Sequence, residues 1–142
     1  MHRSALAAIA LGAILASAGF ASAEEKKFTA NLAAASEVPP NDSAGTGTAE
    51  ITFDTESKEL TWTVEFSGLT GPATGAHFHG PAAEGENAGV AVAIEGTESP
   101  LSGSATLTDE QVAQLEGGMW YVNIHTEANP DGEIRGQVAA GM

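Results

Sequence analysis

Apolar and polar residues alternate one by one over most of the chain. The run Trp62–Phe66 is typical, with apolar side chains at every second position and threonine or glutamate between them. Successive side chains of a β-strand point to opposite faces, so the pattern predicts strands with one apolar side. Eight short runs show it: Phe28–Leu32, Ile51–Phe53, Trp62–Phe66, His77–His79, Val90–Ile94, Leu101–Leu107, Met119–His125 and Ile134–Val138.

Turn-forming residues separate these runs, chiefly Gly, Pro, Asn, Asp and Ser. Short strands at such spacing are typical of an antiparallel sandwich or barrel. Because each strand has one apolar side, two sheets can bury a shared core between them. We therefore predict an all-β, Greek-key β-sandwich of seven to eight antiparallel strands.

One segment departs from the strand pattern. Thr108 followed three residues later by Gln111 forms a capping-box signature. Val112 and Leu115 then lie on one helical face, and the glycine pair 117–118 ends the segment. The sequence predicts one short helix near Thr108–Leu115.

The first 23 residues have the features of a secretory signal peptide. Arg3 precedes the apolar stretch Ala5–Phe20, and Ala21-Ser22-Ala23 fits a cleavage site. The alternative is a membrane anchor, but the stretch is short for a bilayer span and contains two glycines and a serine. We expect residues 24–142 to form a single secreted or periplasmic domain with no membrane span.

Charge and cysteine content exclude several classes of function. The chain has 19 acidic against five basic residues, a net charge of −14, which repels nucleic-acid phosphates. It has no cysteine, which excludes disulfides, thiolate zinc sites, iron–sulfur clusters, blue-copper sites and c-type haem. No nucleophile elbow or phosphate-binding glycine loop is present, so the sequence predicts no enzyme.

The histidines are the most distinctive polar residues. His2 falls in the predicted signal, and the other three are His77, His79 and His125. Alternation places His77 and His79 together on the side of their strand opposite Phe78. His125 likewise shares a side with Tyr121 and Asn123, opposite the apolar residues of its run. All three are therefore expected on the outer face, where replacement by alanine costs little stability.

Three converging imidazoles suit a divalent metal, either Cu²⁺ or Zn²⁺. Alternate strand residues lie about 6.6 Å apart, a span that two rings can close onto one ion. His125 completes the set of His77 and His79 if its strand is a neighbour, and an all-nitrogen site favours copper. The equally open alternative is that the histidines are structural and hydrogen-bond to loops. A copper oxidoreductase is a third hypothesis, supported by the histidines alone.

Two further polar features have ordinary interpretations. Residues 127–134 resemble an EF-hand calcium loop at several positions, but Val138 stands where the bidentate glutamate belongs. The segment Asn129–Gly132 is typical of a tight turn between two strands, which we favour. Glu133 and Arg135 share a strand side and are predicted to form a surface salt bridge, either with each other or with Asp131.

Four segments resemble the CHRD family, a domain named from chordin and found singly in many exported bacterial proteins. They are FTANLAAASEVPP, GAHFHGPA, TLTDEQVAQLEGG and YVNIHTEANPDGEIRGQV. The resemblance covers nearly all of residues 24–142 and implies an immunoglobulin-like β-sandwich of largely unknown role. In chordin, copies of the domain belong to an extracellular antagonist of a growth factor, and no motif for that function is matched here.

We expect a non-enzymatic, exported binding module with the histidines as its site. The alternative is a module that binds another extracytoplasmic protein or a matrix polymer through a sheet face or edge. In that alternative His77, His79 and His125 are structural. The oligomeric state does not follow from the sequence.

Overall fold

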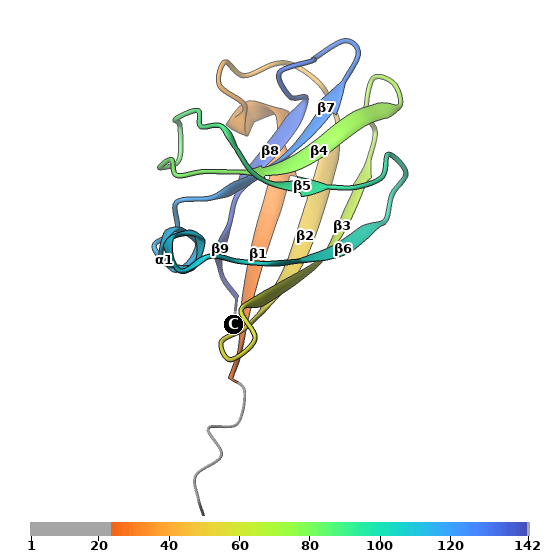
Figure 1. Ribbon diagram of the computed structural model, residues 1–142. Helices are drawn as coiled ribbons and strands as arrows, with labels where there is room; N and C mark the ends of the chain where they lie inside the picture. The colour runs from red at the N-terminus through yellow and green to blue at the C-terminus, as the bar shows by residue number, and fades with distance from the viewer. Residues whose placement is uncertain (1–23, 142) are drawn as a thin grey trace, which may run out of the picture.

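Nine β-strands and one α-helix make up residues 24–141, the part of the chain that this computed structural model describes (Figure 1). The predicted signal peptide, residues 1–23, lies outside the described residues. The strands are β1 (Glu25–Ala33), β2 (Thr46–Asp54), β3 (Glu59–Ser67), β4 (Ala73–His79), β5 (Val90–Ile94), β6 (Leu101–Thr106), β7 (Tyr121–Thr126), β8 (Ile134–Gln137) and β9 (Ala139–Ala140). The helix α1 spans Asp109–Glu116, and a 3₁₀ turn, η1, spans Ala34–Ser36.

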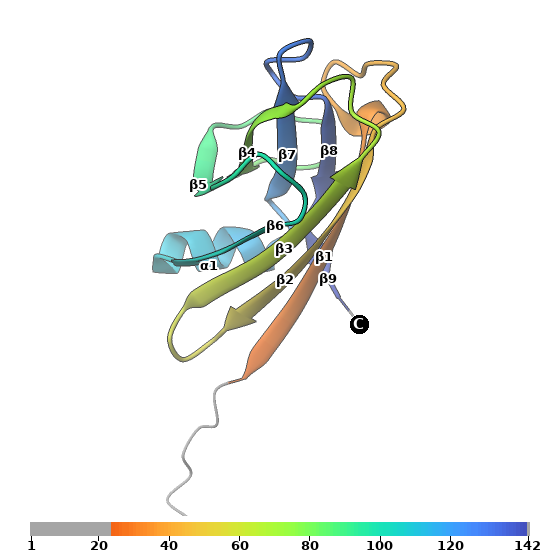
Figure 2. The ribbon, with the colours of Figure 1, turned by 90° about the vertical axis from the view of Figure 1, so that its right-hand side faces the viewer.

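The strands form one antiparallel sheet rather than the predicted two-sheet sandwich. Its order is β5-β4-β7-β8-β1-β2-β3-β6, and β9 also pairs with β1. Figure 2 shows the sheet curling so that β1, β2 and β3 face β4, β5, β7 and β8 across the core. The sheet forms a nearly closed barrel. Closure is incomplete because no ladder joins the two end strands, β5 and β6, within residues 24–141. The all-β class is confirmed, whereas the Greek-key sandwich is not.

The strand β1 joins the two halves of the sheet, β5-β4-β7-β8 on one side and β2-β3-β6 on the other. It pairs with β2 along its whole length and, on its other edge, with β8 and β9. The β1–β8 pairing is a single residue pair, Ala33 with Arg135. The backbones approach closely here, since a Cβ on Gly136 would lie 2.2 Å from the Asn31 carbonyl oxygen. A glycine at 136 therefore permits the junction.

The core consists of the apolar sides that alternation predicts. Phe78, Val122 and Ile124 on the histidine strands are fully buried, as are Phe53 and Leu60 on the opposite side. The ring of Trp62 meets the edge of Phe78 at 5.2 Å between centroids, which links the two halves. The inward orientation of Phe78 and Ile124 fixes the opposite orientation of the histidines.

The predicted helix is confirmed. Thr108 is its N-cap and forms the complete capping box with Gln111, and Leu115 is buried. Gln111 also donates a hydrogen bond to the Ala91 carbonyl of β5, so the helix lies beside the edge of the sheet. Across residues 24–141, none of the helical segments has the length and apolarity to cross a membrane.

Candidate functional site

Strand pairing brings the three histidines together. The strands β4 and β7 are neighbours, with His77 opposite Asn123 and His79 opposite Tyr121. His125 follows Asn123 by two residues and lies on the same side. One nitrogen from each of His77, His79 and His125 falls within 4.8 Å of the others. The condition set by the sequence, that the strand of His125 neighbours the strand of His77, is therefore met.

Backbone carbonyls fix the orientation of two rings. The Nδ1 of His79 lies 3.0 Å from the carbonyl oxygen of Ala88, and that of His125 lies 2.8 Å from the carbonyl oxygen of Pro130. A carbonyl oxygen only accepts hydrogen bonds, so each Nδ1 carries the proton and each neutral ring has a lone pair on Nε2. Metal-binding histidines are commonly oriented in this way, with the other ring nitrogen donating to a carbonyl.

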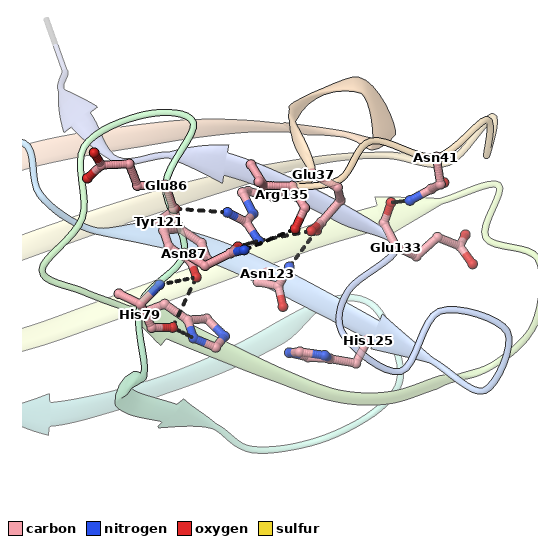
Figure 3. A network of polar contacts seen from close by, with 12 residues as sticks. Glu37, Asn41, His79, Glu86, Asn87, Tyr121, Asn123, His125, Glu133 and Arg135 are labelled. Carbon is pink, nitrogen blue, oxygen red and sulfur yellow. Dashed lines mark hydrogen bonds and ion pairs between the residues drawn. The ribbon is translucent and has the colours of Figure 1, made fainter.

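The two Nε2 atoms have different surroundings. His125 Nε2 lies 3.0 Å from His77 Nδ1, close enough to share a hydrogen bond. His79 Nε2 is buried and has no hydrogen-bond partner among the described residues. Figure 3 shows a nitrogen of the His79 ring and one of the His125 ring turned toward each other. The free lone pair of His79 therefore faces the rest of the cluster.

Burial favours the neutral form of His77 and His79. Burial lowers the pKa of His77, and the neighbouring His125 lowers it further. Burial also lowers the pKa of His79, although its bond to Ala88 opposes the shift. Both imidazoles are therefore neutral at pH 7, which is the form that binds a metal ion.

A second layer of side chains supports the histidines. The Tyr121 ring stacks on His79 with 4.8 Å between centroids, and the Arg135 guanidinium lies 4.0 Å from the Tyr121 centroid. The Tyr121 hydroxyl donates to the Ala88 carbonyl and accepts from the Ala88 amide, both at 3.1 Å. Ala88 therefore holds both rings of the stack, so His79 cannot move without disturbing Tyr121.

A buried ion pair lies beside this stack (Figure 3). Arg135 contacts the Glu37 carboxylate at 3.1 Å, and the Asn123 amide donates to the other Glu37 oxygen. Arg135 also donates to Asn87 at 2.7 Å and to the Glu86 carbonyl at 3.2 Å. Burial raises the pKa of Glu37 to about 7, and Arg135 offsets only part of that rise. The pair joins η1, β8 and the loop after β4.

The expectation of an exposed outer face is therefore wrong for most of this surface. Tyr121 and Asn123 are only 2% and 1% exposed, and His79 is also buried. The segments around Glu37 and residues 82–89 fold over the outward side of β7 and supply its hydrogen-bond partners. Alternation identifies which side of a strand is polar, but it does not reveal that a loop covers that side.

The predicted surface salt bridge between Glu133 and Arg135 is also wrong. Arg135 pairs with Glu37, and Glu133 is fully buried. The Glu133 carboxylate accepts hydrogen bonds from the side chains of Ser43, Thr70, Thr126 and Asn129 and from the Thr70 amide. Burial alone would raise the pKa of Glu133, but these hydrogen bonds outweigh burial and lower it to about 2.

The tight turn after β7 is confirmed. The Gly132 amide donates to the Asn129 carbonyl at 3.0 Å, and the Asn129 side-chain amide donates to the Glu133 carboxylate. Gly132 adopts a φ of +128°, and a Cβ there would lie 2.2 Å from Asn123 Nδ2 and 2.7 Å from Glu37 Oε1. Glycine therefore gives the turn its conformation and leaves room for the Asn123–Glu37 contact.

Unpartnered atoms concentrate around the histidines. Within residues 24–141, four buried side-chain polar atoms lack a hydrogen-bond partner: His79 Nε2, Asn123 Oδ1, Arg135 Nε and Trp62 Nε1. The first three belong to the histidine cluster and to the second layer of side chains that supports it. Buried polar atoms normally have partners, so this group of exceptions makes the layer a candidate place for a water, an ion or another ligand.

The sequence did not assign four residues of the candidate site: Glu37, Tyr121, Asn123 and Arg135. Tyr121 and Asn123 carried a signal, since they share the strand side of His125. Glu37 carried none, because it follows a 3₁₀ turn in a loop far from the histidines in sequence.

The chain matches a known protein family over the segments that form the fold and the candidate site. A family model described as the CHRD domain matches residues 28–138, which is most of the chain. Neither the curated proteins nor the solved structures give a significant match to the sequence. The matched residues include all three histidines, Glu37, Asn123, Glu133 and Arg135. On the extent of this match, the chain belongs to the CHRD domain family.

Proposed function

We propose that this CHRD domain is a non-enzymatic binding module that holds one Cu²⁺ or Zn²⁺ ion through His77, His79 and His125. The observation that carries the proposal is the convergence of one nitrogen from each ring within 4.8 Å. The fixed Nδ1 protons of His79 and His125 support it, because they put the lone pair of each ring on Nε2.

The spacing suits a metal after small ring movements. Two nitrogens bound to tetrahedral zinc at 2.0–2.1 Å are about 3.4 Å apart. The His77–His125 distance of 3.0 Å is already close to this value, and the widest pair must close by about 1.4 Å. Rotation of the half-exposed His77 ring, which no backbone carbonyl of residues 24–141 holds, contributes to that movement.

A proton competes with the ion in this proposal. For His77 Nδ1 and His125 Nε2 both to bind the metal, the hydrogen between them must move to Nε2 of His77, which is a change of tautomer. Acid weakens binding because protonated imidazoles have no lone pair for the ion, and burial lowers the pKa of His77 and His79, so for these two ligands the loss begins below the ordinary value of 6.5. Copper is favoured over zinc, because an all-nitrogen donor set follows the usual order of divalent affinities.

Calorimetric titration of the purified protein with Cu²⁺ and Zn²⁺ tests the proposal. The expected result is one ion per chain for the wild type and no tight site in the variant His77→Ala/His79→Ala/His125→Ala. The exposed Glu98→Ala is the matched control for adventitious binding to an acidic surface. Equal Cu²⁺ uptake by the wild type and the triple variant would contradict the proposal.

A second candidate is an interaction module in which the histidines are structural. The hydrogen bonds from His79 to Ala88 and from His125 to Pro130 support it, because each holds a loop against β4 or β7. The edge of β5, where Val90 is 57% exposed, is then the surface for another protein or a polymer. Partner binding that survives both metal chelation and the triple alanine substitution favours this candidate.

The proposed module acts outside the cytoplasm, in the periplasm or as a secreted protein. The support is the signal-like sequence of residues 1–23. Cell fractionation, with the N-terminus of the mature protein read by mass spectrometry, tests this part. Cleavage after Ala23 is the expected result, and an uncleaved cytoplasmic chain would contradict it.

A further inference from the structure

Asn123 presents a buried acceptor atom that no group in residues 24–141 uses. Its side chain is 1% exposed, and its Oδ1 has no hydrogen-bond partner in that part of the chain. The other end of the amide is fixed, because Nδ2 donates to a carboxylate oxygen of Glu37. A flip of the amide would place Oδ1 against the Glu37 oxygens, which already face Arg135, so the ionised form of Glu37 determines the orientation of Oδ1.

The free oxygen lies beside the histidines. Asn123 stands directly opposite His77 in the β4–β7 ladder, and it shares its strand side with His125. Figure 3 shows the Asn123 oxygen on the side of the amide that faces the His79 and His125 rings. Any group that occupies the space between these rings is therefore a neighbour of Oδ1.

The ring protons whose positions are determined have other acceptors. The Nδ1 protons of His79 and His125 go to the carbonyls of Ala88 and Pro130, and His77 Nδ1 faces His125 Nε2. A buried acceptor left without a donor destabilises the protein. A donor from outside the chain removes that destabilisation.

We infer that Asn123 Oδ1 accepts a hydrogen bond from an exogenous ligand on the metal ion, most simply a water molecule. This inference rests on the proposed function. Three histidine ligands leave one position open on a four-coordinate ion. Water on that position carries hydrogens and can donate to Oδ1, whereas azide carries none. The site therefore selects, as its fourth ligand, molecules that carry a hydrogen on the coordinating atom.

Azide binding to the Cu²⁺-loaded protein tests the inference. In the wild type, azide must displace a water and leave Oδ1 without a donor. In Asn123→Leu that penalty is absent, so azide affinity should rise about tenfold. The measurements are the azide-to-copper charge-transfer absorption and, in parallel, calorimetry of Cu²⁺ itself, which should show one site in both proteins.

Glu37→Gln is the matched control. It removes the buried carboxylate charge beside Asn123 but keeps an acceptor for Nδ2 and leaves Oδ1 in place. Loss of that negative charge favours an anion, so azide affinity should rise, but by less than in Asn123→Leu, because Oδ1 is still left without a donor when azide binds. An equal rise in Glu37→Gln and Asn123→Leu would show that the effect comes from disturbing the Glu37–Asn123 pair and not from loss of Oδ1, and it would overturn the inference.

A measurement on the wild type covers the case in which Asn123→Leu does not fold. Pulsed electron paramagnetic resonance of the Cu²⁺ protein in D₂O should detect exchangeable deuterons from a bound water, and their absence overturns the inference. One Cu²⁺ per wild-type chain with azide affinity unchanged in Asn123→Leu overturns the inference but leaves the proposed function intact. No stoichiometric Cu²⁺ uptake by the wild type overturns both.

Discussion

Two polar centres, both next to the turn between β7 and β8, are built on opposite principles. We call them the Glu133 centre and the histidine centre. The Glu133 centre consists of Glu133, Ser43, Thr70, Thr126 and Asn129. The histidine centre consists of His77, His79, His125, Asn123, Glu37, Tyr121 and Arg135.

The Glu133 centre is satisfied from within the chain. Its carboxylate accepts five hydrogen bonds, and none of its members has an unpartnered buried side-chain atom in residues 24–141. The histidine centre contains three of the four such atoms there. A closed network stabilises the fold, whereas an incomplete one leaves positions for a ligand. Burial alone would not separate the two roles.

The largest expected effect is on the Glu133 centre. Glu133→Ala should lower the free energy of unfolding by about 3–4 kcal/mol, because it leaves several buried donors without an acceptor. Denaturant unfolding measures the change. The exposed Glu127→Ala, in the same turn, is the control and should stay within about 0.5 kcal/mol of the wild type. Similar losses in the two variants would contradict a structural role for the Glu133 centre.

Acid should weaken the same centre. The folded pKa of Glu133 lies at about 2, below its ordinary value of 4.5, so its contribution is present above pH 4.5 and lost as the pH falls toward 2. The contribution is about 3 kcal/mol. Unfolding curves at several pH values should show a flatter acid limb for Glu133→Gln than for the wild type.

Glu37 should respond with the opposite sign. Burial raises its folded pKa to about 7, so protonation stabilises the fold below pH 4.5 and that contribution is lost as the pH rises through 7. Glu37→Gln removes the titration and should therefore gain stability relative to the wild type between pH 4.5 and 7. The same series of unfolding curves measures it, and parallel wild-type and variant profiles would contradict the expectation.

Metal should stabilise the histidine centre alone. At 100 times its dissociation constant, a bound ion adds about 2.7 kcal/mol to the free energy of unfolding. Thermal unfolding with and without Cu²⁺ should show this shift for the wild type and for Glu133→Gln. The triple histidine variant should show none, and a comparable shift there would indicate binding elsewhere.

The smallest effect separates the histidines from each other. His79→Ala should cost about 1–2 kcal/mol without metal, because it removes the stack on Tyr121 and the bond to Ala88. Replacement of the half-exposed His77 by alanine should lower the free energy of unfolding by about 0.5 kcal/mol or less. Chemical denaturation of the apo proteins distinguishes them, and equal losses would contradict the difference in burial. The sequence-based expectation that both replacements cost little is thus kept only for His77.

Local patterns in the sequence were sufficient for the elements of the fold. Period-two alternation predicts the eight main strands, since the side-chain geometry of a strand depends on its own backbone. The capping box likewise predicts the helix, because Thr108 and Gln111 satisfy each other within four residues. Closure of the strands into one curled sheet was not predicted, because it depends on a single junction between β1 and β8.

For the candidate site, the sequence by itself determined the residue types and the side of the strand. It placed His77 and His79 on one side and His125 on the polar side of another strand. Only the tertiary structure decided that β4 and β7 are neighbours, that a loop covers the face, and that Arg135 pairs with Glu37 and not Glu133. The physical reason is the separation in sequence over which each feature is decided. The side of a strand that a side chain takes depends only on its adjacent residues. The partner of a buried charge is set by which distant segments share the same desolvated space.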